Sequence, residues 1–97
     1  MTYDEIAQIY YKNNFSQFIS DYKYLGLYST SSLTIKDVKK DIFEKMKKYK
    51  NINFCLNDLS DLKIVNDKYE YYQDNKKLIE LQFKSKIYLN YVIIYDL

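Results

Sequence analysis

Hydrophobic positions in the first half of the chain recur at the three- and four-residue spacing of helices. A capping-box pattern at Thr2 and Glu5 predicts a first helix over about residues 3–12. The same spacing predicts a second, shorter helix over about residues 16–25. Gly26 is expected to close this helix, because glycine adopts a left-handed cap at little cost.

The clearest helical pattern follows Thr34, a suitable N-cap residue, and predicts a third helix from Ile35 to about Tyr49. Its apolar side chains form one stripe, so this face is expected to pack on the core. The stripe consists of Ile35, Val38, Ile42, Met46 and Tyr49.

In the second half of the chain the hydrophobic period changes to two, which is typical of strands. Short polar pairs separate the apolar runs, as hairpin turns do, and they predict an antiparallel β-meander. Its strands are expected over residues 62–65, 68–73, 77–83 and 86–95, with a further short strand over residues 53–56.

These elements predict a two-layer α+β domain, in which three N-terminal helices pack on one face of a C-terminal antiparallel β-meander of about four strands. A chain of 97 residues has room for one core, so residues 1–97 are expected to form a single domain. The longest apolar stretch, Tyr91 to Tyr95, is too short to span a bilayer. No export signal is visible at the acidic N-terminus, so we expect a cytoplasmic protein without membrane contact.

The composition is informative mainly through the residue types that the chain lacks. The chain has no His, Trp, Pro or Arg, one Gly and one Cys, but 13 Tyr, and its 15 basic residues are all Lys. Such a bias is typical of A/T-rich codons, so only the placement of Tyr and Lys carries functional information. A formal charge of +2 favours neither a mimic of a polyanion nor a strongly basic nucleic-acid protein.

The missing residues exclude most familiar catalytic sites. A Ser or Cys nucleophile normally needs a neighbouring His, and a phosphate-binding loop needs several glycines. Cys55 lies in an apolar context and predicts a buried, unreactive thiol, and no second Cys is present to form an intramolecular disulfide. Asp58, Asp61 and Asp67 lack the Gly and the closing Glu of a calcium loop, so they predict turns. We therefore expect no enzyme, no cofactor and no metal; acid/base catalysis by carboxylates or Tyr is the remaining enzymatic alternative.

The outward positions of the predicted sheet are unusually apolar for a face that meets water. Such a face predicts a contact surface for a partner protein or a second copy, because Tyr supplies a large area and a hydroxyl at low entropic cost. The alternative is a strand covered on both faces within the monomer. The candidate interface residues are Tyr69, Tyr71, Tyr72, Leu78, Tyr88, Val92 and Ile94.

One flank of the third predicted helix gathers lysines around an aromatic residue. Lysines interleaved with an aromatic can follow a phosphate backbone and stack on bases, so nucleic-acid binding is the alternative function. The competing interpretation is a solvated flank with the aromatic ring tucked under residues 27–33, since Arg is absent and acids share the helix. The flank consists of Lys36, Lys39, Lys40, Phe43, Lys47 and Lys50.

In size and composition the whole chain resembles the small accessory proteins of phages and mobile elements in A/T-rich bacteria, a group that includes anti-CRISPR and other anti-defence inhibitors. The resemblance involves no motif and assigns no residue a role. It implies a protein that works stoichiometrically on a larger host complex. The sequence thus predicts a small non-enzymatic binding protein, an inhibitor of a host nucleic-acid-processing complex that acts by protein–protein contact.

Overall fold

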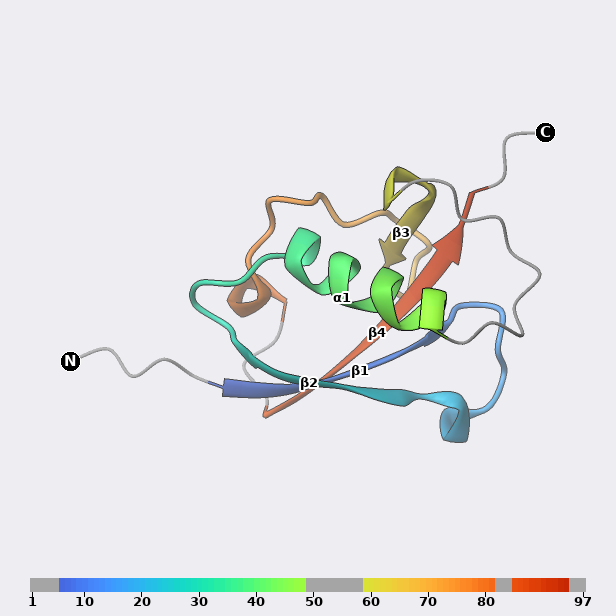
Figure 1. The fold of residues 1–97 in the computed structure, drawn as a ribbon, viewed down its shortest axis with the longest axis horizontal. Helices are drawn as coiled ribbons and strands as arrows, with labels where there is room; N and C mark the ends of the chain where they lie inside the picture. Colours follow the sequence, from blue (N-terminus) through green and yellow to red (C-terminus); the bar gives the residue numbers. More distant parts are fainter. Residues whose placement is uncertain (1–5, 49–58, 82–84, 95–97) are drawn as a thin grey trace.

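The computed structural model describes residues 6–48, 59–81 and 85–94 and shows one helix on a four-stranded sheet (Figure 1). The strands are β1 (Ile6–Asn13), β2 (Lys23–Ser29), β3 (Leu62–Val65) and β4 (Lys86–Ile93), and the α-helix is α1 (Ile35–Lys48). Three short 3-10 helices complete the described elements: η1 (Ile19–Asp21), η2 (Leu59–Asp61) and η3 (Leu78–Glu80).

The sheet is mixed, with strand order β2-β1-β4-β3. β1 and β2 form an antiparallel hairpin, β3 and β4 pair antiparallel, and the central strands β1 and β4 run parallel. Parallel neighbours require a crossover connection, and α1 lies within this connection. Figure 1 shows α1 across one face of the sheet and η1 on the opposite side.

Within the described residues, the predictions of helices over residues 3–12 and 16–25 are wrong. In β1, Ala7, Ile9 and Tyr11 are buried and alternate with more exposed neighbours, which is the period of a strand and not of a helix. β-branched and aromatic residues fit a pleated surface, and cross-strand packing overrides the short helical spacing. The predicted fold of three helices on a meander is therefore replaced by one helix on a mixed sheet.

Gly26 does not close a helix but lies inside β2 beside a break in strand register. Ile9 pairs with Gly26, whereas Tyr10 pairs with Tyr24, so Leu25 is an extra residue in the ladder. This irregularity increases the local twist of the edge strand, as β-bulges do.

The meander is wrong as well, although two of its strands and the third helix are confirmed. Residues 62–65 form β3, most of residues 86–95 form β4, and α1 lies within the range expected for the third helix. Residues 68–73 form a loop with a single bridge between Val65 and Tyr71, and η3 occupies part of residues 77–83. The strand expected over residues 53–56 and the buried thiol expected at Cys55 lie outside the described residues.

The core lies between α1 and the inner face of the sheet. Burying one large aliphatic side chain stabilises a fold by about 1.5–3 kcal/mol, and the apolar stripe of α1 supplies several such groups. The fully buried side chains of this layer include Ile35, Val38 and Ile42 of α1, Ile9 of β1, Leu62 and Ile64 of β3, and Ile87 of β4.

The loop over residues 66–77 is tied to the N-terminus of α1. The backbone N–H groups of Ile35 and Lys36 donate to the carbonyl oxygens of Lys76 and Asp74, at 2.9 and 3.0 Å. These bonds satisfy N–H groups that a helix leaves free at its first turn. The buried Lys39 adds an ion pair, with its Nζ 2.8 Å from Oδ1 of Asp74. The loop is therefore held against the helix at several points.

Candidate functional site

The face of the sheet opposite α1, the outer face, carries a row of aromatic side chains. Tyr10 of β1 is the register partner of both Tyr24 in β2 and Tyr88 in β4, so all three project to the same side. The ring centroids of Tyr10 and Tyr88 lie 5.1 Å apart in a stacked arrangement, and those of Tyr10 and Tyr24 lie 5.4 Å apart. At the end of the row, the Tyr22 ring lies edge-on against the Tyr88 ring, with centroids 5.0 Å apart. We call these four residues the tyrosine row.

Hydrogen bonds fix the end of the tyrosine row at Tyr22. Its hydroxyl donates to Oδ1 of Asn90 at 2.7 Å, and the Asn90 amide donates to Oδ1 of Asn14 at 3.2 Å. Nζ of Lys12 donates to the Ser16 carbonyl at 2.6 Å and lies 5.1 Å from the centre of the Tyr22 ring. Burial raises the pKa of Tyr22, and the charge of Asp67 adds to this effect, so the phenol stays neutral near pH 7. The row is therefore a preorganised surface.

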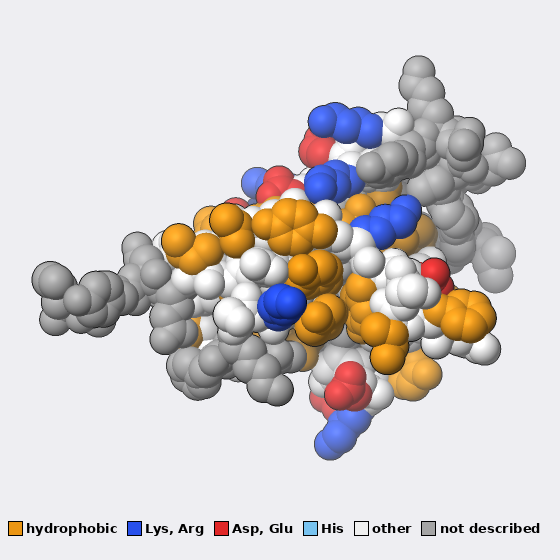
Figure 2. Space-filling view, turned by 90° about the horizontal axis from the view of Figure 1, so that it is seen from below, with side chains coloured by type: hydrophobic (Ala, Val, Ile, Leu, Met, Phe, Trp, Pro, Cys, Tyr) orange, Lys and Arg blue, Asp and Glu red, His pale blue; other side chains and the backbone are white. Residues whose placement is uncertain are grey.

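Exposed apolar side chains extend beyond the row. Tyr24 and Tyr88 are 48% and 46% exposed, and Leu27 of β2 is 63% exposed. The connection between β1 and β2 adds Phe15 and Ile19, which are 77% and 84% exposed. Figure 2 shows this side of the molecule, where hydrophobic side chains gather across the middle and acidic side chains lie toward the margins. Monomeric proteins rarely leave so many large apolar groups together in water.

Charge is unevenly distributed over the sheet. The four strands contain Lys12, Lys23, Lys63 and Lys86 but no Asp or Glu. The described acids lie instead in α1, in the 3-10 helices and in loops. The sheet therefore combines aromatic side chains with positive charge and offers little to attract a cation along its strands.

The structure brings some of the predicted interface residues together and separates others. Tyr88 and Val92 lie on the outer face, and Ile94, 36% exposed, follows directly after β4. Tyr69 and Tyr71 are exposed on the loop over residues 66–77, and Tyr71 forms a bridge to Val65 of β3, so neither belongs to a strand of the sheet. Tyr72 is half-buried against the core, and Leu78 is fully buried in η3. Leu78 is thus a core residue and offers no contact surface.

Sequence reasoning missed Tyr10, Tyr22 and Tyr24, which complete the tyrosine row. The helices expected over residues 3–12 and 16–25 placed these residues on helical faces. A period-two pattern in Ala7, Ile9 and Tyr11 was the signal that could have identified β1.

The lysine flank of α1 does not present an exposed aromatic residue. Phe43 and Lys39 are 8% and 2% exposed, and Nζ of Lys47 lies 4.4 Å from the centre of the Phe43 ring. Lys36 and Lys40 are exposed, whereas Lys50 lies outside the described residues. A base cannot stack on Phe43 in this arrangement, because the core and Lys47 occupy the ring.

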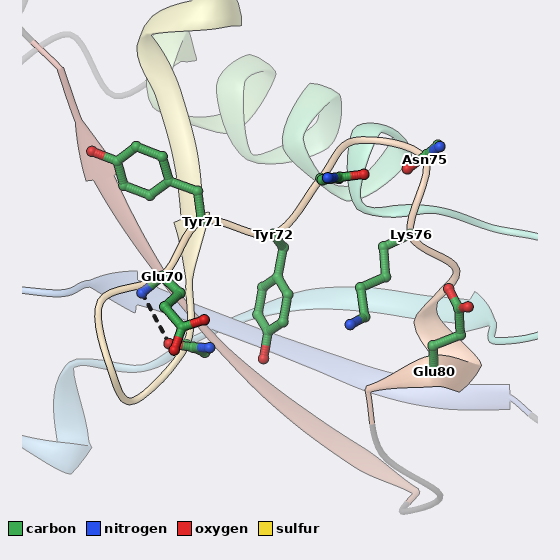
Figure 3. Close-up of a pocket in the computed structure, with 8 residues that line it drawn as sticks. Glu70, Tyr71, Tyr72, Asn75, Lys76 and Glu80 are labelled. Atoms are coloured by element: carbon green, nitrogen blue, oxygen red, sulfur yellow. Dashed lines mark hydrogen bonds between the residues drawn. The ribbon is translucent and has the colours of Figure 1, made fainter.

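A cavity of about 450 Å³ lies under the loop over residues 66–77. Figure 3 shows Tyr72 and Lys76 directed into the space between the loop and the sheet, while Tyr71 turns away. Glu70 and Glu80 also line the cavity, and Nζ of Lys76 lies 5.4 Å from the Tyr72 ring centre. Its mixed charges can bind polar groups, but the lining residues include no nucleophile paired with a base.

The acidic residues singled out in the sequence are not gathered into a catalytic or metal site. Asp61 belongs to η2, Asp67 lies on the loop after β3, and Asp58 lies outside the described residues. Over residues 6–48, 59–81 and 85–94, no group of three or more His, Cys, Asp or Glu side chains could hold a metal ion. In the same segments no helix is both long and apolar enough to cross a membrane.

Comparisons with known proteins do not assign a family to this chain. No protein-family model matches the sequence, and a search among curated proteins finds no significant relative.

Proposed function

We propose that this protein is a non-enzymatic binding protein that docks on a partner protein through its outer face. The tyrosine row, flanked by Leu27 and by the exposed apolar residues of the β1–β2 connection, is the observation that carries the proposal. Aromatic side chains in a rigid, partly exposed cluster are typical centres of binding energy in protein interfaces. Small size and phage-like composition support a stoichiometric inhibitor of a larger host complex.

The charge of the outer face indicates which kind of surface the partner presents. Lys63 of β3 and Lys86 of β4 project from the outer face, where they pair with Val92 and Gln8, and none of the four described strands contains an acid. An apolar patch rimmed by Asp and Glu on the partner would match this pattern, whereas a basic patch would be repelled.

The same charges limit how the protein would inhibit a nucleic-acid-processing complex. The groove of such a complex that holds phosphates is basic, and the lysines of the outer face would oppose docking there. We therefore expect the protein to occupy an acidic surface of the complex and not to imitate a nucleic acid.

A photo-crosslinking experiment in the native cell tests the proposal. A photoreactive amino acid replaces Leu27, which is exposed beside the tyrosine row on the outer face, and a matched control variant carries it at Lys40 on the exposed side of α1. We expect one protein adduct from the Leu27 position and none of the same mass from the Lys40 position. Adding Lys63→Glu and Lys86→Glu should abolish the adduct, because these changes reverse the charge of the face.

Other outcomes identify other functions. Equal adducts from both positions would contradict docking through the outer face. An adduct with a second copy of this chain would show self-association in place of a partner. Nucleic acid crosslinked mainly from Lys40, with binding that weakens steeply as salt rises, would favour the lysine flank of α1 instead.

A further inference from the structure

A second, smaller cavity adjoins the tyrosine row. It has a volume of about 210 Å³ and lies where the loop after β3 approaches β4. This volume is below the ~300–1,000 Å³ of pockets that hold drug-sized ligands, so it suits a single side-chain head group. Its polar and aromatic lining residues are Tyr22, Asn66, Asp67, Tyr72, Tyr88 and Asn90.

The lining combines three phenol rings with one carboxylate. Asp67 is exposed on the loop, and no lysine is among the lining residues. Aromatic rings around a carboxylate attract organic cations, because ring faces and carboxylate oxygens are both negative. Asn66 and Asn90 add carboxamide groups that can accept or donate hydrogen bonds.

One observation relates the charge of Asp67 to two of the phenols, and a second shows that the same two rings lie beside ammonium groups. Asp67 contributes to raising the pKa of both Tyr22 and Tyr72, after the larger effect of burial on each. Both rings also hold ammonium groups of this chain, from Lys12 at 5.1 Å and from Lys76 at 5.4 Å. Neither lysine is among the residues that line the smaller cavity.

We propose that this cavity binds the ammonium or guanidinium group of a Lys or Arg side chain from the protein docked on the outer face. This inference rests on the proposed function, because Tyr22 and Tyr88 belong to both the cavity and the tyrosine row. The bound cation would hold the partner at the margin of the outer face, whose strands are otherwise positive. It would also fix the position in which the partner docks. A partner with a matching acidic rim but no cation at this position would bind more weakly.

The isolated protein allows a test that needs no partner. Tyr ring resonances are followed by NMR while tetramethylammonium or methylguanidinium chloride is added at constant ionic strength. We expect saturable shifts of Tyr22, Tyr72 and Tyr88, and no saturable shift with tert-butanol, a neutral molecule of similar size. Asp67→Asn should weaken cation binding by about tenfold, since it removes the charge from an exposed residue without changing its size.

Two further variants complete the test. Glu80→Gln changes a carboxylate that lines the larger cavity only, so it should leave the titration unchanged. Tyr72→Leu should abolish the shifts, which separates the role of the ring from that of the carboxylate. Equal responses to the cation and to tert-butanol, or equal affinity in Asp67→Asn, would overturn the proposed site.

The partner assay distinguishes this inference from the proposed function. Loss of the Leu27 adduct in Asp67→Asn would support a partner side chain as the occupant. An unchanged adduct together with cation binding would overturn the partner as the source and leave a site for a free organic cation. An unchanged adduct without any cation binding would overturn the site while the proposed function stands.

Discussion

Tyr10 and Tyr88 come from opposite ends of the sequence and stack on each other across the parallel strands β1 and β4, with ring planes 20° apart. The contact exists only because β4 inserts between β1 and β3. The register that pairs the buried Ile9 with Ile87 on the inner face also pairs Tyr10 with Tyr88 on the outer face. The central strand pairing therefore builds the exposed stack.

The first prediction concerns the energy of this stack. In a double-mutant cycle, Tyr10→Ala and Tyr88→Ala should show a coupling of about 0.5–1.5 kcal/mol in the free energy of unfolding. Urea denaturation followed by circular dichroism measures each variant. Pairing Tyr88→Ala with Lys40→Ala provides the control, because Lys40 lies on α1 beyond the other face of the sheet and the two effects should add. Additive effects for Tyr10 and Tyr88 would contradict a stabilising stack.

The sequence predicts the elements whose local pattern agrees with their tertiary setting. α1 carries a continuous apolar stripe, and β3 and β4 alternate, so these three were found close to their observed bounds. β1 was missed because Ile6, Ile9 and Tyr10 also fit a helical spacing, and only pairing with distant strands decides between the two periods. No local pattern encodes that β4 runs parallel to β1.

The candidate site was predictable only in part for the same reason. Tyr88 and Val92 were placed correctly, because their outward positions follow from the alternation of β4 alone. Tyr10, Tyr22 and Tyr24 required the topology of the sheet. The burial of Leu78 required the docking of η3 on the core, which alternation within residues 77–83 could not show.

The second prediction concerns the hydroxyl of Tyr28, which donates to Oδ2 of Asp41 at 2.5 Å and links β2 to α1. Burial and this hydrogen bond raise the pKa of Tyr28. Above pH 10 the unfolded chain loses its phenol proton first, so the stability from this group is present at neutral pH and falls as pH rises. The loss is at most about 1.4 kcal/mol per pH unit for one proton.

Urea denaturation between pH 8 and 11 should show a smaller loss of stability with pH for Tyr28→Phe than for the unchanged protein. The substitution should itself cost about 1–2 kcal/mol at pH 7, because it removes a hydrogen bond to a carboxylate. Tyr69→Phe on the exposed loop serves as the control and should follow the unchanged protein. Parallel curves for Tyr28→Phe and the unchanged protein would contradict the assignment.

The third prediction concerns the ion pair between Lys39 and Asp74. The Lys39 side chain is 2% exposed, whereas Asp74 is 51% exposed. Asp74→Ala should lower the free energy of unfolding by about 1–3 kcal/mol, because it leaves a buried ammonium group without its carboxylate. Adding Lys39→Met to Asp74→Ala should restore part of this loss, since Met keeps much of the apolar stem and removes the charge.

Thermal and urea denaturation measure both changes, with Lys40→Met as the matched control on the exposed side of α1. The control should change stability by less than about 0.5 kcal/mol. An Asp74→Ala variant with an unchanged free energy of unfolding would show that solvent, and not Asp74, provides the hydrogen bonds of the Lys39 ammonium group.

The last prediction concerns the central position of β1 and β4. Backbone amides that bond the central strands β1 and β4 to each other exchange with solvent only through large openings. The N–H groups of Gln8 and Asn14 donate to the carbonyl oxygens of Ser85 and Tyr91, so the slowest amides should lie at Tyr10 and Lys12 of β1 and at Ile87 and Leu89 of β4. Amides of β2 should exchange faster, because this strand forms an edge of the sheet and pairs only with β1. Hydrogen exchange followed by NMR measures both groups, and cross-strand contacts between Ile9 and Ile87 confirm their parallel register. Helical contact patterns over residues 6–12, or fast exchange in β4, would overturn the topology on which the outer face depends.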